Sequence, residues 1–390
     1  MKRERKKRIE GTVDMAYCGI LLPDEKQEEL ILKTLGCKRF VYNHFLDERI
    51  QAYKDGVSIT YTDQQNKLPA MKDNPETEWL SEVDSTALQN ALRDLQNAFD
   101  NFYHGRMNGR KVGFPKFKCK RDLKSSYRTT NNNNSIHMID KYHIQLPKLG
   151  IVKCKMPRKP KGRIMSATIT KESSGTIRIG IQCETMLSSS AEQTGLSIGV
   201  DLGIKELAIT SNGELYDNPK SYEKNQKRLK RLQRKLSRKP KDSNNREKDR
   251  QKVAKLHKHI KNQRKDATHK MTHELVNQYD VICIEDLKPS IMVKDKYLSK
   301  SISDANFGEI RRQLEYKCAW NNKQLVVVDR FFPSSQLCSV CGARNEKVKN
   351  LGIRYWICPH CKTKHDRDMN AANNILREGL KLLALDKQNE

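Results

Sequence analysis

The sequence lacks any apolar run long enough to cross a bilayer, and no signal-like apolar core follows its basic residues 1–8. A membrane-spanning helix needs about 20 predominantly apolar residues in a row. A secretory signal needs a shorter apolar core directly after its positive charges. Both absences argue against the membrane and secreted classes, so we expect a protein of the cytosol with no membrane partner.

Cysteine spacing typical of disulfides is missing from most of the chain. Of the 11 cysteines, seven stand singly between Cys18 and Cys318 without a pairing rhythm. Single cysteines of this kind are typical of reduced, mostly buried thiols in an intracellular protein. We therefore expect no disulfide framework.

Acidic residues are scarce beside basic ones. Lys and Arg number 75 against 47 Asp and Glu, which gives a net charge of +28 at pH 7. A surplus of this size favours a polyanionic partner, because without one it promotes self-repulsion and non-specific binding. A merely soluble basic surface is the less favoured alternative.

Residues 220–270 hold much of this surplus, with 21 Lys or Arg against five Asp or Glu. Apolar residues recur at helical spacing on both sides of Pro240, which predicts a basic helical hairpin. The cations favour contact with the phosphates of RNA or an RNA–DNA hybrid, although a solvated charged segment is the alternative. The candidate contact residues are Lys227, Arg228, Arg231 and Arg234.

Two Cys-x-x-Cys pairs lie near the C-terminus, separated by 16 residues. Structural zinc takes four thiolate or imidazole ligands in a tetrahedron, and this spacing fits a four-cysteine ribbon. Such a closed site leaves no coordination position for water, so we expect it to support its surroundings rather than to catalyse a reaction. The predicted ligands of one Zn²⁺ are Cys338, Cys341, Cys358 and Cys361.

Three acids stand where predicted elements end or begin. Asp201 closes a strand, Glu285 closes a later apolar strand, and Asp368 opens the terminal helix. A strand-end carboxylate in apolar surroundings is costly unless something pairs with it. Two Mg²⁺ ions about 4 Å apart would offset that cost and stabilise the attacking and leaving oxygens of a phosphodiester. The pattern predicts metal-dependent phosphodiester hydrolysis.

Each of these acids also has a structural explanation. Asp201 can cap a turn, Glu285 can pair with the basic hairpin, and Asp368 can be a helix N-terminal charge. The structural explanation is favoured for one isolated acid. Three acids on one α/β scaffold favour the metal site instead.

The order of elements indicates a mixed α/β sheet in the C-terminal half. Three antiparallel strands at 198–216 precede the hairpin, strands at 280–285 and 325–329 flank a helix from about 303 to 322, and a last helix follows the ribbon. Helices starting at Asp24 and Ser85 form an earlier helical segment, and short strands from about 143 to 181 form a β-rich one. Residues 188–194 read as a polar linker.

Motifs spread over nearly the whole chain resemble the TnpB family of insertion-sequence proteins, also called OrfB, relatives of the compact type V CRISPR effectors. The last four of them are highly specific in combination. In chain order, the seven motifs are residues 39–43, 87–92, 113–118, 199–203, 284–287, the cysteine pairs with Ser334 and Ser335 ahead of them, and 366–372.

The resemblance implies an α/β multidomain protein. Its parts would be a RuvC-like nuclease domain of RNase H type, a helical recognition lobe inserted into a β-barrel wedge domain, and a zinc ribbon before the last acidic helix. The implied boundaries are 1–20 and 113–190 for the wedge, 21–112 for the recognition lobe, 191–330 and 364–390 for the nuclease domain, and 331–363 for the ribbon.

The resemblance places the three nuclease acids on Asp201, Glu285 and Asp368, which would hold two catalytic Mg²⁺ ions. Asp368 is preferred because the Asp-x-Asn-Ala-Ala frame fits it, with Asp366 as a close rival. All three acids are present, which separates this chain from nuclease-dead relatives.

The resemblance also implies the partners. A monomer would bind a guide RNA and cut target double-stranded DNA beside a short transposon-adjacent motif, in the prokaryotic cytosol and at the nucleoid when on DNA. Contacts to that motif are expected around Tyr42, Gln89 and Arg93.

Two other functions compete with a guided nuclease. One is a guide-RNA-dependent DNA-binding repressor that does not cleave. The other is a transposase with a Tyr nucleophile beside a His-apolar-His metal site. The latter is disfavoured because the His-x-His sequence here, His257 to His259, has Lys258 in its middle.

Overall fold

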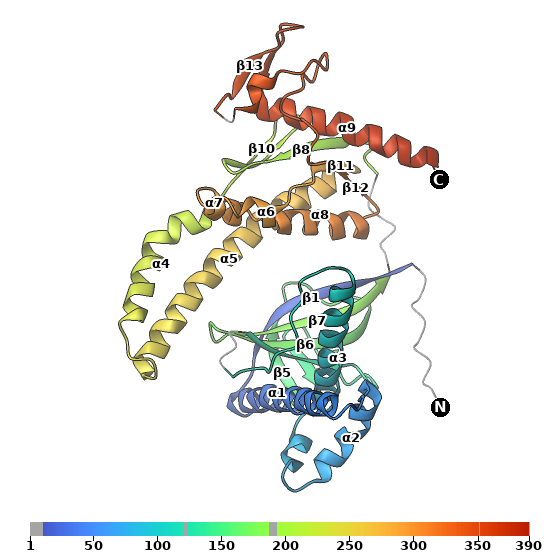
Figure 1. The fold of residues 1–390 in the computed structure, drawn as a ribbon, viewed down its shortest axis with the longest axis vertical. Helices are drawn as coiled ribbons and strands as arrows, with labels where there is room; N and C mark the ends of the chain where they lie inside the picture. The colour runs from blue at the N-terminus through green and yellow to red at the C-terminus, as the bar shows by residue number, and fades with distance from the viewer. Residues whose placement is uncertain (1–10, 121–123, 187–192, 351, 390) are drawn as a thin grey trace. The chain divides into compact units, whose positions relative to one another are not determined.

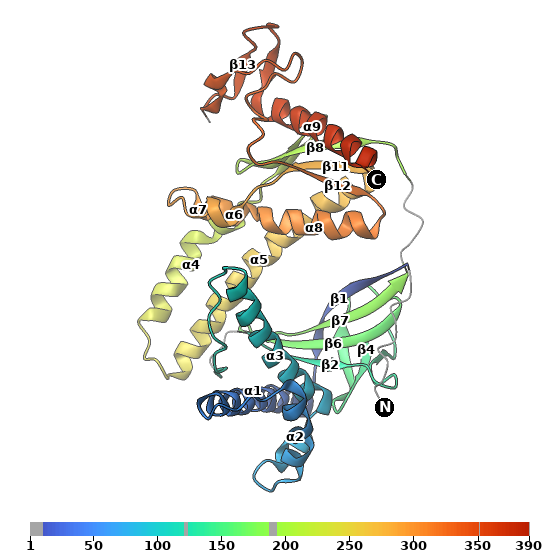
Figure 2. The same ribbon diagram turned by 45° about the vertical axis from the view of Figure 1, so that its right-hand side comes forward.

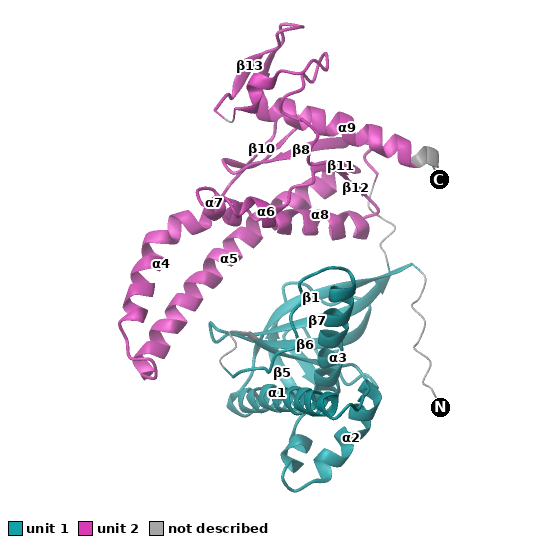
Figure 3. Ribbon diagram, in the orientation of Figure 1, with its two compact units in different colours: residues 1–186 teal, residues 187–390 magenta. Residues whose placement is uncertain are grey.

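The structure is a computed structural model that describes residues 11–120, 124–186, 193–350 and 352–389. The chain divides into two compact units, Met1–Met186 and Leu187–Glu390 (Figure 3). The predicted linker at 188–194 lies mostly outside the described residues, and the finer predicted boundaries stay predictions. None of the helices in the described ranges combines the length and apolar composition that a membrane span requires.

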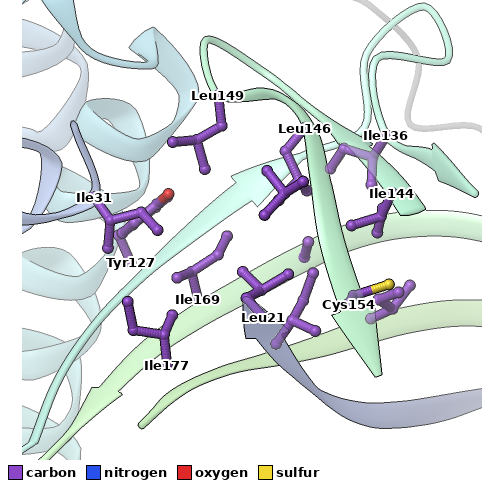
Figure 4. Packing of buried hydrophobic residues seen from close by; sticks show 14 of the residues in the cluster. Leu21, Ile31, Tyr127, Ile136, Ile144, Leu146, Leu149, Cys154, Ile169 and Ile177 are labelled. Carbon is purple, nitrogen blue, oxygen red and sulfur yellow. The ribbon is translucent and has the colours of Figure 1, made fainter. Parts of the chain in front are cut away.

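Unit 1 contains a seven-stranded antiparallel sheet in the order β2-β6-β7-β1-β5-β4-β3. Side chains alternate between the two faces of each strand, so one face of the sheet is apolar. Ile177, Ile179 and Ile181 of β7 are buried on that face and pack with Leu21 and Tyr127 in the core shown in Figure 4. Pairing runs linearly from β2 to β3 among the described residues, so closure into a barrel stays a prediction. The strands are β1 (Thr12–Leu22), β2 (Lys124–Thr130), β3 (His137–Met138), β4 (His143–Leu146), β5 (Gly150–Lys155), β6 (Arg163–Glu172) and β7 (Ile177–Met186).

The helices of unit 1 lie between β1 and β2 in the sequence and pack beside the sheet (Figure 2). The predicted helix start at Asp24 is confirmed, because Asp24 and Gln27 form a capping box. The helix predicted to start at Ser85 is confirmed as well, whereas α2 has few buried apolar residues and so gave no periodic signal. These elements are α1 (Glu25–Lys54), α2 (Tyr61–Asp73), the 3-10 helix η1 (Glu78–Glu82) and α3 (Ser85–Met107).

Unit 2 is built on a five-stranded mixed sheet in the order β10-β9-β8-β11-β12, which confirms the predicted mixed α/β sheet. β8 pairs antiparallel with β9, while β11 runs parallel to both β8 and β12. Helices cover both faces, with α9 on one face and α5 and α8 on the other (Figure 1). The strands are β8 (Ser197–Leu202), β9 (Glu206–Thr210), β10 (Leu215–Asp217), β11 (Val281–Glu285) and β12 (Gln324–Val328), with β13 (Tyr355–Ile357) and β14 (Lys364–Asp366) forming a separate ribbon.

The helices of unit 2 correct one prediction. The single helix expected from about 303 to 322 is two helices, because Asn306 adopts the left-handed conformation (φ 62°) that ends one and starts the next. The basic hairpin is confirmed as α4 followed by α5. The helices are α4 (Ser221–Ser237), α5 (Asn244–Gln278), α6 (Pro289–Met292), α7 (Ser299–Ala305), α8 (Phe307–Trp320), the 3-10 helix η2 (Glu346–Lys349) and α9 (Arg367–Asn389).

A buried carboxylate fixes the base of the hairpin. Asp304 in α7 accepts hydrogen bonds from Nε of Arg264 in α5 at 2.7 Å and from the backbone N–H of Tyr222 in α4 at 2.9 Å. A negative charge at the N-terminal end of α4 also suits the helix dipole. The two long helices therefore leave the sheet side by side from one anchored point.

Two glycines let α9 approach the sheet closely. A Cβ atom on Gly199 of β8 would lie 2.1 Å from the carbonyl oxygen of Ala372, and a Cβ on Gly379 would lie 2.3 Å from Sγ of Cys283. Real Cβ atoms do not come this close to a backbone oxygen. The glycine in the motif at 199–203 is thus required for packing between strand and helix.

We expect Gly199→Ala to destabilise unit 2 by about 1 to 3 kcal/mol, because α9 would have to move away from β8. Chemical denaturation of the two proteins would measure the difference. The matched control is Gly36→Ala in α1, where an added Cβ meets nothing within 4 Å. That change should leave stability equal or raise it by up to about 1 kcal/mol. An unchanged unfolding free energy for Gly199→Ala would contradict the tight contact.

Candidate active site and metal centre

The sheet register places Asp201 beside Glu285. Val200 is the partner of Ile284 in the parallel pair β8 and β11, so the next residue of each strand lies at the same level. Side chains alternate along a strand. Gly199 and Cys283 both face α9. Asp201 and Glu285 each stand two residues further along the same strands, so they face α9 as well.

The third predicted acid comes from α9 on that same face. Asp368 lies in the first turn of the helix. Its rival Asp366 plays a different part, because its Oδ1 atom accepts the backbone N–H groups of Asp368 and Met369, each at 3.0 Å. Asp366 therefore caps the helix, while the charge of Asp368 acts on Asp201. Asp368 as the third acid stays a prediction.

The electrostatics of Asp201 agree with this placement. Burial is the largest cause that raises the pKa of Asp201, and together with the negative charges of Glu285 and Asp368 it brings that pKa to about 8. Burial also raises the pKa of Glu285, while a hydrogen bond from the Ser334 hydroxyl to Oε1 of Glu285 opposes that rise. Three carboxylates gathered in this way repel one another, and a cation among them would relieve the repulsion.

Arg354 and Arg367 bring positive charge close to the three acids, and the sequence analysis did not identify either of them. Nη1 of Arg354 lies 2.7 Å from Oδ2 of Asp368, and the charges of Arg367 and Arg354 lower the pKa of Asp201. Arg354 also accepts the backbone N–H of Arg367 at 2.8 Å through its carbonyl oxygen. Arg354 has no motif signal of its own, because it lies in the ribbon, 14 positions before its acid partner.

The chemistry of these donors fits Mg²⁺. Carboxylate oxygens are the ligands that hard divalent cations prefer, and a cation would offset both the burial and the two acidic neighbours that raise the pKa of Asp201. Among the described residues the ligand atoms of Cys338, Cys341, Cys358 and Cys361 form a compact group that could hold a metal ion, and the three acids form no such group. The ion pair with Arg354 holds one of them, so shared binding of a metal requires Asp368 to turn from Arg354.

The four predicted cysteines converge at the base of the ribbon. Their sulfur atoms all lie within 4.8 Å of one another, and Sγ–Sγ distances are 3.5 Å for Cys338 and Cys361 and 3.6 Å for Cys341 and Cys358. A tetrahedral zinc site with Zn–S bonds of about 2.3 Å gives sulfur separations of about 3.8 Å, whereas a disulfide bond is about 2.05 Å. The geometry fits zinc and excludes disulfides within this set.

Hydrogen bonds surround these sulfurs. Nε2 of His365 lies 3.1 Å from Sγ of Cys338, and the Thr363 hydroxyl lies 3.2 Å from Sγ of Cys361. The bond from Thr363 lowers the pKa of Cys361 to about 6, which favours the thiolate that zinc binds. The rings of His365 and Trp356 lie against each other with centroids 4.7 Å apart and planes tilted by 36°. Partners of this kind orient metal ligands.

Asparagines of α9 join the ribbon to the acids. Nδ2 of Asn370 donates to the carbonyl oxygen of Leu337 at 2.7 Å, and its Oδ1 accepts the N–H of Ser339 at 2.9 Å. Nδ2 of Asn374 donates to the carbonyl oxygens of Ser334 and Leu337 at 2.8 and 2.7 Å. Residues 366–374 therefore supply the helix cap, one acid of the candidate site, and two asparagines whose hydrogen bonds hold the ribbon against the helix.

The predicted phosphate contacts lie on α4. A shallow groove on this helix is lined entirely by cations, and it includes three of the four predicted residues. Arg228 is exposed on the same helix but is not among the residues that line the groove. The lining residues are Lys227, Lys230, Arg231, Arg234, Lys235, Arg238 and Lys239.

The structure separates the three residues predicted near the transposon-adjacent motif. Gln89 and Arg93 are exposed on α3, where they are accessible to a partner, and their role stays a prediction. Tyr42 is 3% exposed in the helical core, with Nζ of Lys118 at 4.9 Å from its ring centre. The prediction for Tyr42 is wrong as a direct contact, because its ring is already covered by protein.

Three family descriptions match parts of this chain. They are the OrfB description "Probable transposase" over residues 180–295, "Cas12f1-like, TNB domain" over 307–375, and "Helix-turn-helix domain" over 15–57. The first spans β8 to β11 with the basic hairpin, and the second spans the ribbon and the start of α9. The third falls here on β1 and α1 rather than on two helices.

Curated relatives match the chain almost end to end. A protein of Streptomyces pristinaespiralis named "Putative RNA-guided DNA endonuclease" is 37% identical over 373 residues, covering 94% of this chain and 90% of the relative. The Escherichia coli K12 protein named "Putative RNA-guided DNA endonuclease InsQ" is 34% identical over 385 residues, covering 93% and 92%.

Solved structures share the fold. One of them is titled "Cryo-EM structure of the Cas12f1-sgRNA-target DNA complex", and the match has a TM-score of 0.57 over 94% of this chain and 99% of that one. Sequence identity is 12%, so the likeness concerns the fold alone.

Proposed function

The chain belongs to the TnpB, or OrfB, family of insertion-sequence proteins, and from this premise we propose that it is an RNA-guided, magnesium-dependent DNA endonuclease. The observation that carries the proposal is the gathering of three carboxylates on one face of the sheet, with the pKa of Asp201 raised to about 8 by burial and by its acidic neighbours. The names of the relatives supply the substrate class, which the acids alone do not specify.

Each residue of the site has a proposed role. Asp201 and Glu285 lie on adjacent strands of a rigid sheet and would hold the metals, and Asp368 would complete the site once released from Arg354. Bound Mg²⁺ would activate a water and neutralise charge on the phosphodiester. Arg354, once free, would offer its guanidinium to a phosphate oxygen, for which its planar donors are well suited.

The partners follow from the charge distribution and from the relatives. A guide RNA would choose the target by base pairing, which leaves the protein to hold backbones and to read a short adjacent motif. The cationic groove of α4 is suited to a phosphate backbone. Gln89 and Arg93 on α3 would serve at the adjacent motif, with the whole complex working as a monomer in the cytosol and at the nucleoid.

We expect Arg231→Gln combined with Arg234→Gln to weaken guide-RNA binding. Each lost phosphate contact should lower the slope of log affinity against log salt concentration by about 1, so the double variant should lose about 2. Fluorescence anisotropy across a KCl series measures that slope. The matched control is Lys270→Gln on α5, whose charge is already paired with Asp266 at 2.8 Å. An unchanged slope in the double variant would exclude the groove as the RNA site.

A guided cleavage assay tests the function. The protein would be purified with its RNA, that RNA would be sequenced, and plasmids bearing the matching target would be incubated with Mg²⁺ or with EDTA. Cleavage that requires both the matched target and Mg²⁺ supports the proposal. Tight target binding without cleavage under any divalent metal would favour the non-cleaving repressor, and purely heterogeneous cellular RNA would refute the guide.

A further inference from the structure

Two exposed aromatic residues stand next in sequence to arginines that pair with acids of the candidate site or beside it. Phe331 is 83% exposed and Tyr355 is 78% exposed. Each directly follows an arginine that pairs with a carboxylate at or beside the site. Nη2 of Arg330 lies 2.8 Å from Oδ2 of Asp286, the residue after Glu285, and Arg354 pairs with Asp368.

Phe331 is held firmly although its ring faces solvent. Its backbone N–H donates to Oδ1 of Asp329 at 2.8 Å, and the Arg330 guanidinium lies 5.6 Å from its ring centre. Three residues further on, the Ser334 hydroxyl donates a hydrogen bond to Glu285. The carbonyl oxygen of Ser334 accepts a hydrogen bond from Asn374 of α9. The loop that presents the ring is thus tied to the acid on one side and to α9 on the other.

Tyr355 approaches the same acids from the ribbon. It is the first residue of β13 and pairs in register with Asp366 of β14, the cap of α9. β13 lies beyond the end of α9 that carries Asp368 (Figures 1 and 2). The two rings therefore come from separate segments that meet at the start of one helix.

A fixed, exposed aromatic ring beside a guanidinium is the arrangement that binds an unpaired nucleobase. The ring stacks on the base, the cation faces the phosphate, and every base offers a face for stacking. The neighbouring carboxylates disfavour an acidic peptide as the occupant. An apolar protein partner would have to cover Arg330 and Arg354 as well.

We propose that Phe331 and Tyr355 are positioning residues that stack on unpaired bases of the DNA strand being cut, and so set its phosphate against the three acids. This inference rests on the proposed nuclease function. Loss of one stacking contact should slow cleavage about tenfold or more. Binding of the guide RNA should not change, because neither residue lies on the basic hairpin.

The test compares guided cleavage rates of wild type, Phe331→Ala, Phe331→Trp and Tyr355→Ala. The matched control is Tyr297→Ala, which removes a ring that is 92% exposed in the turn between α6 and α7. We expect slow cleavage for both alanine variants at the site and near wild-type rates for Phe331→Trp and for the control. A purely structural role for the loop would not be rescued by the larger ring.

A second readout reports stacking directly. Target DNA carrying single 2-aminopurine bases would be bound to the guided complex of Asp201→Ala, and fluorescence would be scanned along each strand. We expect quenching at one or two positions, which disappears when Phe331→Ala is added. If wild type cleaves while both alanine variants cleave equally fast with unchanged quenching, the stacking inference is wrong. If wild type does not cleave at all, the proposed function itself fails, and the inference with it.

Discussion

Asp201→Ala is expected to abolish guided DNA cleavage while guide-RNA and target binding stay at the wild-type level. Asp201 lies on the central β8 strand, next to Glu285 on the parallel strand and within electrostatic range of Asp368. It is therefore the acid that both of the others surround. Removing it would remove the central carboxylate of the proposed metal site.

The expected size of the effect follows from what metal ions contribute. Charge stabilisation by a bound metal is worth several kcal/mol, and about 4 kcal/mol corresponds to roughly a thousandfold in rate. Single-turnover plasmid cleavage with the purified complex measures it. Asp201→Asn should be equally inactive, since it keeps the shape but loses the charge that binds Mg²⁺.

Asp217→Ala is the matched control for this prediction. Asp217 also ends a strand of the same sheet, but it is exposed at the far edge on β10, two strands away from β8. Its loss should leave cleavage unchanged. Cleavage at the wild-type rate by Asp201→Ala would refute the assignment of the acids, whereas equal loss in both variants would indicate a general defect of the sheet.

The strands that carry the acids were predictable because short apolar runs ending in a carboxylate are a local signal. β8 and β11 each show such a run, and the register that brings Asp201 beside Glu285 follows once they pair in parallel. The sequence alone left Asp366 and Asp368 as rivals, because both precede the same helix. In the structure Asp366 caps that helix, which favours Asp368 for the site, and the assignment stays a prediction.

Other parts of the site depend on contacts between distant segments, for which no local pattern exists. Arg354 becomes part of the site only because the ribbon folds back on α9. Tyr42 shows the opposite case: the sequence indicated a contact to the adjacent motif, and only the packed helices reveal that the ring is buried. Likewise, the break at Asn306 depends on one backbone conformation that helical periodicity does not reveal.

Removal of zinc is expected to stop cleavage as completely as loss of an acid, although zinc takes no part in the reaction. The ribbon has a small core, in which Cys338 and Cys358 themselves pack with Val348 and Trp356. Its strands β13 and β14 are three residues long each. Zinc supplies on the order of 10 kcal/mol to such segments, so without it the ribbon should unfold locally.

The consequences of that unfolding reach the acids through named contacts. The hydrogen bonds from Asn370 to Leu337 and Ser339 would be lost, and the Arg354 guanidinium proposed to meet a phosphate oxygen would no longer be held beside the acids. Positioning errors of about 1 Å cost roughly a hundredfold in rate. The basic hairpin is anchored separately through Asp304, so guide-RNA binding should persist.

Cys358→Ser tests this coupling, with Cys18→Ser as the matched control because Cys18 is an exposed cysteine of β1 in unit 1. We expect Cys358→Ser to lack bound zinc by mass spectrometry, to expose the ribbon to rapid hydrogen exchange, and to cleave at least about a hundredfold more slowly. The control should match wild type in all three measurements. A zinc-free Cys358→Ser protein that cleaved at the wild-type rate would show that the acids hold their geometry without the ribbon, and that its ties to α9 serve stability alone.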